Sequence, residues 1–283
     1  MKNVHIIIDS TVDIPFSLKQ QLRVVPLRVL FGEEEYIDGV TITHQSFYEK
    51  LIESDRLPYT SQATPCDFDE KFKEITNKGE SAVVLTLASS LSGTYQSACI
   101  AAAEYENIYV VDTESVAIGS GILAQRALQF KEQGLPAQEI ACRLEREKTQ
   151  VRLVALVDTL EYLKRGGRLS KTAAVAGGLL NIKPVLALVS GQIQLLGKAR
   201  GSKQGNNLLI KEIEKAGGVD FDRPVLLGYT GLSDLMINKY KEDSAPLWKH
   251  AKEDLPVTPI GSVIGTHVGP DAIAVAFFSK NEA

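Results

Sequence analysis

Apolar and polar positions in the first half of the chain follow two alternating patterns. Short runs rich in valine and isoleucine predict buried parallel strands at residues 4–8, 82–87 and 108–111. Longer segments between polar turns predict helices at 117–133 and 137–148. Strands that alternate with helices indicate an open α/β sheet, in which ligands bind beyond the carboxyl ends of the strands.

Local signals add elements to this pattern. Residues 24–30 predict a further strand, and residues 36–37 predict its return as a hairpin. Pro15 lies in the first turn of a short predicted helix, where its missing N–H has no consequence. Thr43 predicts the N-cap of one helix, and Thr64, followed by a proline, predicts the N-cap of the next.

The pattern changes near residue 150, where strands and helices stop alternating regularly. The predicted elements are a strand at 153–157, a helical segment from 159, a hairpin of 185–189 with 192–196, a helix at 202–215, a strand at 225–229, a largely helical segment at 234–252 and a strand at 272–278. This order is typical of an α+β unit. We therefore expect two lobes, residues 1–150 and residues 151–283, and because no low-complexity linker separates them we expect a shared interface.

Composition excludes several classes of function. The 283 residues are 44% hydrophobic and 23% charged, and the net charge of −4 argues against a general nucleic-acid-binding protein. Three widely spaced cysteines without a CxxC pair predict reduced thiols in a cytoplasmic protein, and no apolar run is long enough to span a bilayer. A GxGxxA match at 119–124 falls inside a predicted helix and the histidines are scattered, so we expect neither a dinucleotide nor a metal site.

Candidate chemistry is concentrated in the segment LASSLSGTYQSA, which joins a predicted strand to a predicted helix. Ser92 is a natural N-cap for this helix, but one cap leaves the other hydroxyls unused. The free N–H groups of a helix start suit an anion, with Gly93 permitting close approach and Thr94 beside it. Thr60 and Ser61, which precede their own helix cap, form a second set of hydroxyls without a capping role.

These residues leave two functions open. Ser92 is a candidate nucleophile of an esterase or thioesterase if His267, in a predicted glycine-flanked loop, serves as its base. Alternatively, the strand ends bind a phosphorylated small molecule. A set of basic residues stands out in a chain of net negative charge: Arg165, Arg168, Lys198, Arg200 and Lys203. These residues indicate either solvated helix ends or a docking patch for an acidic partner or a phosphate.

Six motifs occur in order along nearly the whole chain. They are DST at 9–11, TSQ at 60–62, SGTYQSA at 92–98, RGGRLS at 165–170, LNIKPV at 180–185 and GTHVGP at 265–270. Together they resemble the DegV family of bacterial fatty-acid-binding proteins. One departure is the sequence Ala63-Thr64-Pro65, where the family usually has proline directly after the glutamine.

The resemblance implies a two-lobed fold with an open, mostly parallel N-terminal sheet, a C-terminal α+β lobe and one long-chain fatty acid, such as palmitate, buried between them. It implies that Thr60 and Ser92 hold the carboxylate. The residues that it places beside the carboxylate are Ser61, Gly93, Thr94 and His267.

The resemblance also implies a carrier that has no catalytic residue and needs no cofactor. Some members present the acyl carboxylate to a separate kinase, which converts it to acyl phosphate with ATP, and the segments around Arg168 and Arg200 would then dock that partner. Burial of the tail gains ~0.8 kcal/mol per methylene, while a buried carboxylate requires several fixed donors. Neutral hydroxyls and helix-end amides supply such donors and leave the carboxylate chemically intact.

Overall fold

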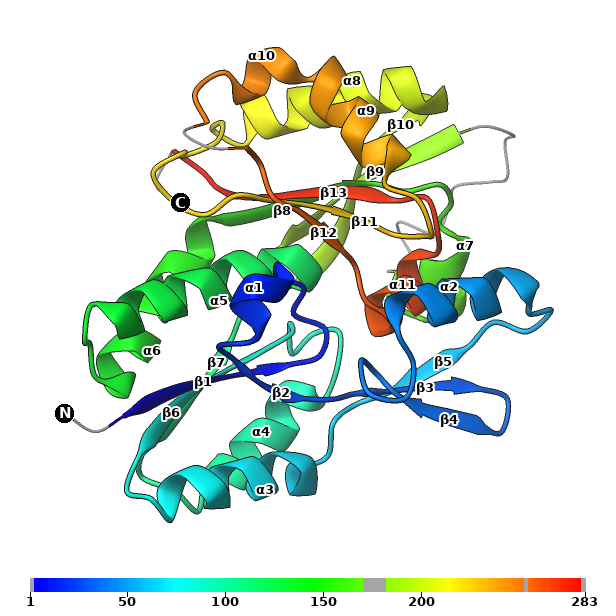
Figure 1. The fold of residues 1–283 in the computed structure, drawn as a ribbon. Coiled ribbons are helices and arrows are strands. Elements are labelled where there is room, and N and C mark those ends of the chain that lie inside the picture. The colour runs from blue at the N-terminus through cyan, green and yellow to red at the C-terminus, as the bar shows by residue number, and fades with distance from the viewer. Residues whose placement is uncertain (1–2, 170–181, 252–253, 281–283) are drawn as a thin grey trace.

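The structure, a computed structural model, describes residues 3–169, 182–251 and 254–280. Its first sheet is formed by β1 (Val4–Asp9), β2 (Arg23–Val25), β6 (Ser81–Thr86) and β7 (Ile108–Asp112). The four strands are parallel and lie in the order β2-β1-β6-β7 (Figure 1). The strands predicted at 4–8, 82–87 and 108–111 are thus confirmed, and so is the open α/β arrangement of this half.

A second, mixed sheet is built from strands in the second half of the chain. Its six strands are β8 (Val151–Leu156), β9 (Ile182–Val189), β10 (Gln192–Arg200), β11 (Leu226–Tyr229), β12 (Val257–Pro259) and β13 (Ile273–Phe278). They lie in the order β10-β9-β8-β13-β11-β12, and β11 with β12 is the parallel pair among them. The change of pattern near residue 150 coincides with the start of β8, although the division of the lobes at that residue stays a prediction.

A small antiparallel sheet corrects one predicted strand. It consists of β3 (Arg28–Phe31), β4 (Glu34–Ile37) and β5 (Tyr59–Ser61), in the order β4-β3-β5. The prediction of one strand at 24–30 is wrong, because β2 and β3 share this stretch and belong to different sheets. Pro26 separates them, since a residue without an N–H cannot continue a ladder. The hairpin predicted at 36–37 is confirmed as β4.

Helices form layers around the two large sheets. They are α1 (Phe16–Lys19), α2 (His44–Glu53), α3 (Pro65–Thr76), α4 (Thr94–Ala102), α5 (Ala117–Glu132), α6 (Ala137–Glu147), α7 (Glu161–Arg165), α8 (Gly201–Lys215), α9 (Leu235–Asp243), α10 (Ala245–Trp248) and α11 (Ser262–Val268). Figure 1 shows α8, α9 and α10 over one face of the mixed sheet, α5 between the two sheets, and α3 and α4 below the parallel sheet. α5 contacts strands of both sheets, so it joins the two halves.

Alternate residues of the central strand β1 serve two different cores. Ile6 and Ile8 pack into a cluster that contains α5 and residues of the mixed sheet, whereas Ile7 packs with α3 and the small sheet. Because neighbouring side chains of a strand point to opposite faces, a continuous apolar run fills both layers. The apolar layer between the two sheets is therefore shared by both halves of the chain.

Helix starts follow the sequence signals in two cases and depart from them in two others. Thr43 and Thr64 are the N-caps of α2 and α3, and each forms a capping box. α4 begins one residue later than predicted, with Gly93 rather than Ser92 in the N-cap position. Pro15 precedes α1 as its N-cap and does not lie in the first turn.

The loop predicted around His267 is wrong, because residues 262–268 form the helix α11. Gly265 lies inside this helix, where a Cβ would be 2.4 Å from the hydroxyl of the fully buried Tyr48. The glycine therefore permits close packing against α2, and Gly269, at a φ of +78°, ends the helix.

The helical segment predicted at 234–252 is confirmed as α9 and α10 as far as Trp248. Within the described part of the chain, none of the helices combines the length and the apolar character that crossing a membrane requires.

Candidate functional site

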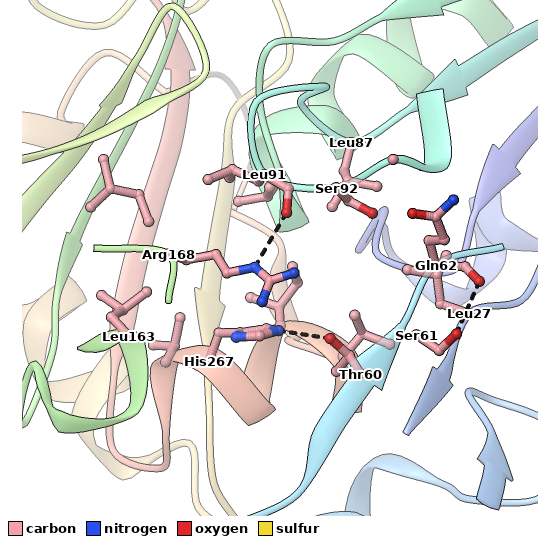
Figure 2. A pocket seen from close by; sticks show the side chains of 16 residues that line it. Leu27, Thr60, Ser61, Gln62, Leu87, Leu91, Ser92, Leu163, Arg168 and His267 are labelled. Atoms are coloured by element: carbon pink, nitrogen blue, oxygen red, sulfur yellow. Dashed lines mark hydrogen bonds between the residues drawn. The ribbon is translucent and has the colours of Figure 1, made fainter. Parts of the chain in front are cut away.

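A cavity of about 320 Å³ opens between the small sheet, the loop after β6 and α11. Hydroxyl, amide, imidazole and guanidinium groups line one part of it, and apolar side chains line the rest (Figure 2). The polar lining consists of Thr60, Ser61, Gln62, Ser92, Gly93, Arg168 and His267. Five of the six residues predicted to bind the ligand thus line one cavity, and Thr94 is buried beside it.

Thr60 and His267 join the first half of the chain to the last helix. Thr60 lies in β5, which pairs with β3, and His267 lies in the last turn of α11. The hydroxyl of Thr60 and Nε2 of His267 are 2.8 Å apart. Burial, and then the charge of Arg168, lower the pKa of His267 to about 4, so the imidazole is neutral at pH 7. His267 is therefore a neutral hydrogen-bonding group in this site.

Ser92 is held by its own loop on the opposite side of the cavity. Its hydroxyl lies 2.9 Å from that of Thr94 and accepts the Thr94 N–H at 3.3 Å. Gly93 is packed against Gln62, because a Cβ at this position would lie 2.2 Å from the Gln62 amide oxygen. Gln62 in turn donates to the hydroxyl of Ser97 on α4, so both hydroxyl-bearing segments are fixed to each other.

Arg168 lines the cavity, although the sequence groups it with the docking residues. Its Nε donates to the carbonyl of Leu91 at 3.3 Å, and its Nη1 donates to the carbonyl of Gly166 at 2.6 Å. Figure 2 shows its guanidinium between Leu91 and His267. Because the imidazole is neutral, Arg168 supplies the positive charge of this end of the cavity.

The other four basic residues lie away from the cavity lining. Arg165, at the end of α7, donates to Glu161 at 3.1 Å. Lys198, Arg200 and Lys203 are exposed on β10 and α8.

A second, wholly apolar cavity of about 80 Å³ adjoins the first. The residues that line both are Val116, Leu163, Ile193, Ile264 and Val268. Beyond them the walls come from the mixed sheet, including Ala155 on β8 and Ala274 on β13. The two cavities are therefore neighbours, one with a polar part and one wholly apolar, and the apolar one reaches into the layer between the sheets.

The hydrogen bonds do not form a serine-hydrolase pair. The hydroxyl of Ser92 pairs with Thr94, and the ring of His267 pairs with Thr60. A serine nucleophile requires the base within hydrogen-bond reach of its oxygen, and here both groups have other partners. The GxGxxA match does not form a dinucleotide-binding loop, because residues 119–124 lie inside α5.

Several lining residues have no distinctive signal in the sequence. Val116, Ile264 and Val268 look like any core residues, and the signal at Arg168, within RGGRLS and the basic set, indicated docking and not the cavity. Gln62 could have been identified as a site residue from the sequence, because it follows two hydroxyl residues and precedes the helix cap without a capping role of its own. Among the described residues, no group of three or more histidine, cysteine, aspartate or glutamate side chains could hold a metal ion.

The fold and the cavity define a two-lobed α/β protein with an amphipathic binding site between its lobes. The chain belongs to the DegV family, because the family model described as "Uncharacterised protein, DegV family" matches residues 3–280. A DegV domain-containing protein of Caldanaerobacter subterraneus subsp. tengcongensis is 34% identical over 290 residues, which cover 99% of this chain and 100% of the relative.

Solved structures agree with this assignment. A DegV family protein from Thermus thermophilus, described as fatty acid binding, superposes with a TM-score of 0.87 at 31% identity and covers 99% of this chain and 100% of its own. A stearic acid-binding protein from Eubacterium ventriosum superposes with a TM-score of 0.86 at 27% identity, with 99% of both chains covered. The predicted two-lobed fold is therefore confirmed.

Proposed function

We propose that this protein binds one long-chain fatty acid, with the carboxylate at Thr60 and Ser92 and the tail in the apolar cavity. The observation that carries the proposal is that a cavity with polar groups on one side adjoins a wholly apolar cavity, with five residues lining both. Ser61, Gly93, Thr94 and His267 adjoin the carboxylate position. The relatives described as binding fatty acids support the same ligand class.

The site chemistry suits a carboxylate that is held without being attacked. Each buried methylene contributes ~0.8 kcal/mol, so a sixteen-carbon tail supplies most of the affinity. The hydroxyls and the Arg168 guanidinium offset the desolvation of the head group. Among the described residues the hydroxyl of Ser92 pairs with Thr94 and not with a base, which favours a carrier over an esterase.

The binding test uses protein produced in a bacterial host and then denatured. Extraction and mass spectrometry are expected to recover about one fatty acid per chain. Thr60→Ala and Ser92→Ala each remove a hydrogen-bond donor to the carboxylate, and each should weaken palmitate binding by about 5- to 100-fold, equivalent to ~1–3 kcal/mol.

Ser89→Ala is the matched control, because Ser89 lies in the same loop and does not line the cavity. Unchanged affinity in both site variants would remove these hydroxyls from the site. Protein that neither carries nor accepts a fatty acid, and that a sugar phosphate stabilises in a thermal-shift assay instead, would favour the phosphorylated-ligand alternative. Labelling of Ser92 by a fluorophosphonate would favour the esterase.

We also propose that the exposed basic residues dock a separate kinase, which phosphorylates the bound acid. Arg165, Lys198, Arg200 and Lys203 offer positive charge outside the cavity, in a chain of net negative charge. Arg168 lies between the cavity and the exposed basic residues, because it lines the cavity and is itself exposed. Charges at the rim of an interface raise the rate at which two proteins associate more than they raise the affinity of the complex.

The docking test measures acyl phosphate formed with ATP and a bacterial fatty acid kinase. The double variant Arg200→Glu and Lys203→Glu should lower the rate at limiting carrier by about tenfold at low salt, and less at high salt, because salt screens these charges. Palmitate affinity should stay the same. Lys78→Glu, at an exposed site after α3, is the control. An undiminished rate in the double variant would place the docking surface elsewhere.

A further inference from the structure

Two aspartates that do not line the ligand cavity hold the amino-terminal end of α11. Asp13 follows β1, and its Oδ1 accepts the N–H of Gly261 at 3.0 Å. Asp38 follows β4, and its carboxylate accepts the hydroxyl and the backbone N–H of Ser262. Both side chains are about 95% buried. The first free N–H groups of α11 are thus paired with carboxyl groups from the first forty residues of the chain.

The other end of the same helix enters the proposed carboxylate site. His267, five residues after Ser262, meets the hydroxyl of Thr60 at 2.8 Å. Between these two ends the helix lies against α2, where Gly265 leaves room for the hydroxyl of Tyr48. The helix has seven residues, is held at both ends and is packed in the middle. A displacement at Gly261 is therefore expected to be transmitted to His267.

We propose that Asp13 and Asp38 are positioning residues, which fix where His267 meets Thr60 by holding the opposite end of α11. This inference rests on the proposed function for its effect on affinity. It gives a role to two acidic residues that the ligand site itself does not use, one close to the DST motif and one directly after β4.

The burial of these carboxyl groups is unfavourable in isolation, and so favours a specific role. Asp13 Oδ2 is buried without a hydrogen-bond partner among the described residues. Burial raises the pKa of Asp13 to about 8, and burial also raises the pKa of Asp38. An apolar residue at either position would avoid this cost but would leave Gly261 or Ser262, respectively, without its acceptor.

The test compares substitutions at Asp38 in the full chain. Asp38→Ala is expected to weaken palmitate binding by about tenfold, because Ser262 at the start of α11 loses its acceptor while Asp13 still holds Gly261. Asp38→Asn keeps Oδ1 as an acceptor and should restore most of that affinity. In ligand-free protein, Asp38→Ala should also shift the Nε2 NMR signal of His267, because the contact with Thr60 loosens, and Asp38→Asn should restore it.

Two further variants separate positioning from general destabilisation. Ser262→Ala removes one contact to Asp38 and should give a smaller change in the same direction, in a protein that still folds. Asp220→Ala removes contacts to Arg223 and Asp222, remote from α11, and should lower the melting temperature without changing affinity or the His267 signal.

Two results would overturn the positioning role. One is an Asp38→Ala protein with wild-type affinity and an unmoved His267 signal. The other is an affinity loss that Asp38→Asn does not restore and that Asp220→Ala reproduces. If the wild-type protein binds no fatty acid, the proposed function fails by itself, and the His267 signal of the ligand-free variants still decides the positioning role.

Discussion

Replacing Ala274 with leucine is expected to weaken binding of a sixteen-carbon fatty acid by about 100-fold and to leave binding of a ten-carbon acid nearly unchanged. Ala274 lies on β13, is 5% exposed and lines the apolar cavity. The added carbons occupy space that the far end of a long tail would take. If three or four methylenes of a long tail are excluded, the binding free energy loses the ~3 kcal/mol that their burial contributes. A short tail does not reach this position.

Isothermal titration with acids of increasing length measures this effect. The matched control is Ala216→Leu, since Ala216 packs on the far side of the mixed sheet and lines neither cavity. The control should bind both acids as the wild type does. An equal loss for the short and the long acid in Ala274→Leu would show that the substitution disturbs the carboxylate end, and unchanged binding of both would place the tail elsewhere.

Asp13→Asn is expected to reduce the fall in stability of the ligand-free protein between pH 6 and pH 8. Burial raises the pKa of Asp13 from 3.8 to about 8, so the folded protein keeps a proton that the unfolded chain releases above pH 4. The free energy of unfolding of the wild type therefore falls as the pH rises towards 8, by up to ~1.4 kcal/mol per pH unit from this group. An asparagine does not titrate, so it adds no pH dependence to the free energy of unfolding.

Neighbouring charged groups define the window of the measurement. Asp9, Asp38, Lys19 and Tyr48 face Asp13, and burial raises the pKa of Asp9 to about 6, so its contribution ends there. Urea unfolding at pH 6, 7, 8 and 9 measures how the free energy of unfolding changes with pH in the range where Asp13 contributes more than Asp9.

Asp67→Asn is the matched control for this measurement. Burial alone would raise the pKa of Asp67, but hydrogen bonds from Arg28 and Thr64 outweigh it and lower that pKa to about 2. The stability that Asp67 contributes is present above pH 4 and is lost as the pH falls towards 2, so Asp67→Asn should leave the slope between pH 6 and 8 unchanged. Identical slopes for the wild type and Asp13→Asn would contradict the prediction.

Predictions from the sequence succeeded where the signal was local. Thr43 and Thr64 cap their helices because an N-cap side chain contacts backbone only a few residues away. The strand predicted at 24–30 failed, since both of its halves are extended and only pairing assigns them to different sheets. The loop predicted around His267 failed as well, because the two glycines look like turn residues until Tyr48 is seen to occupy the space beside Gly265.

By itself, the sequence determined the alternation of strands and helices, the helix caps and the hydroxyl-rich loops, together with motifs specific enough to indicate the family. Each of these depends on neighbours along the chain or on the order of short motifs. Only the tertiary structure brought Thr60 to His267, which is 207 positions away, and placed Arg168 in the cavity.

It also distinguished Ala274, which lines the cavity, from Ala276, which is buried in the core on the same strand. No pattern separates these two alanines, because a cavity is a place where packing from distant elements is incomplete. That property belongs to the assembled layers rather than to any segment of the chain.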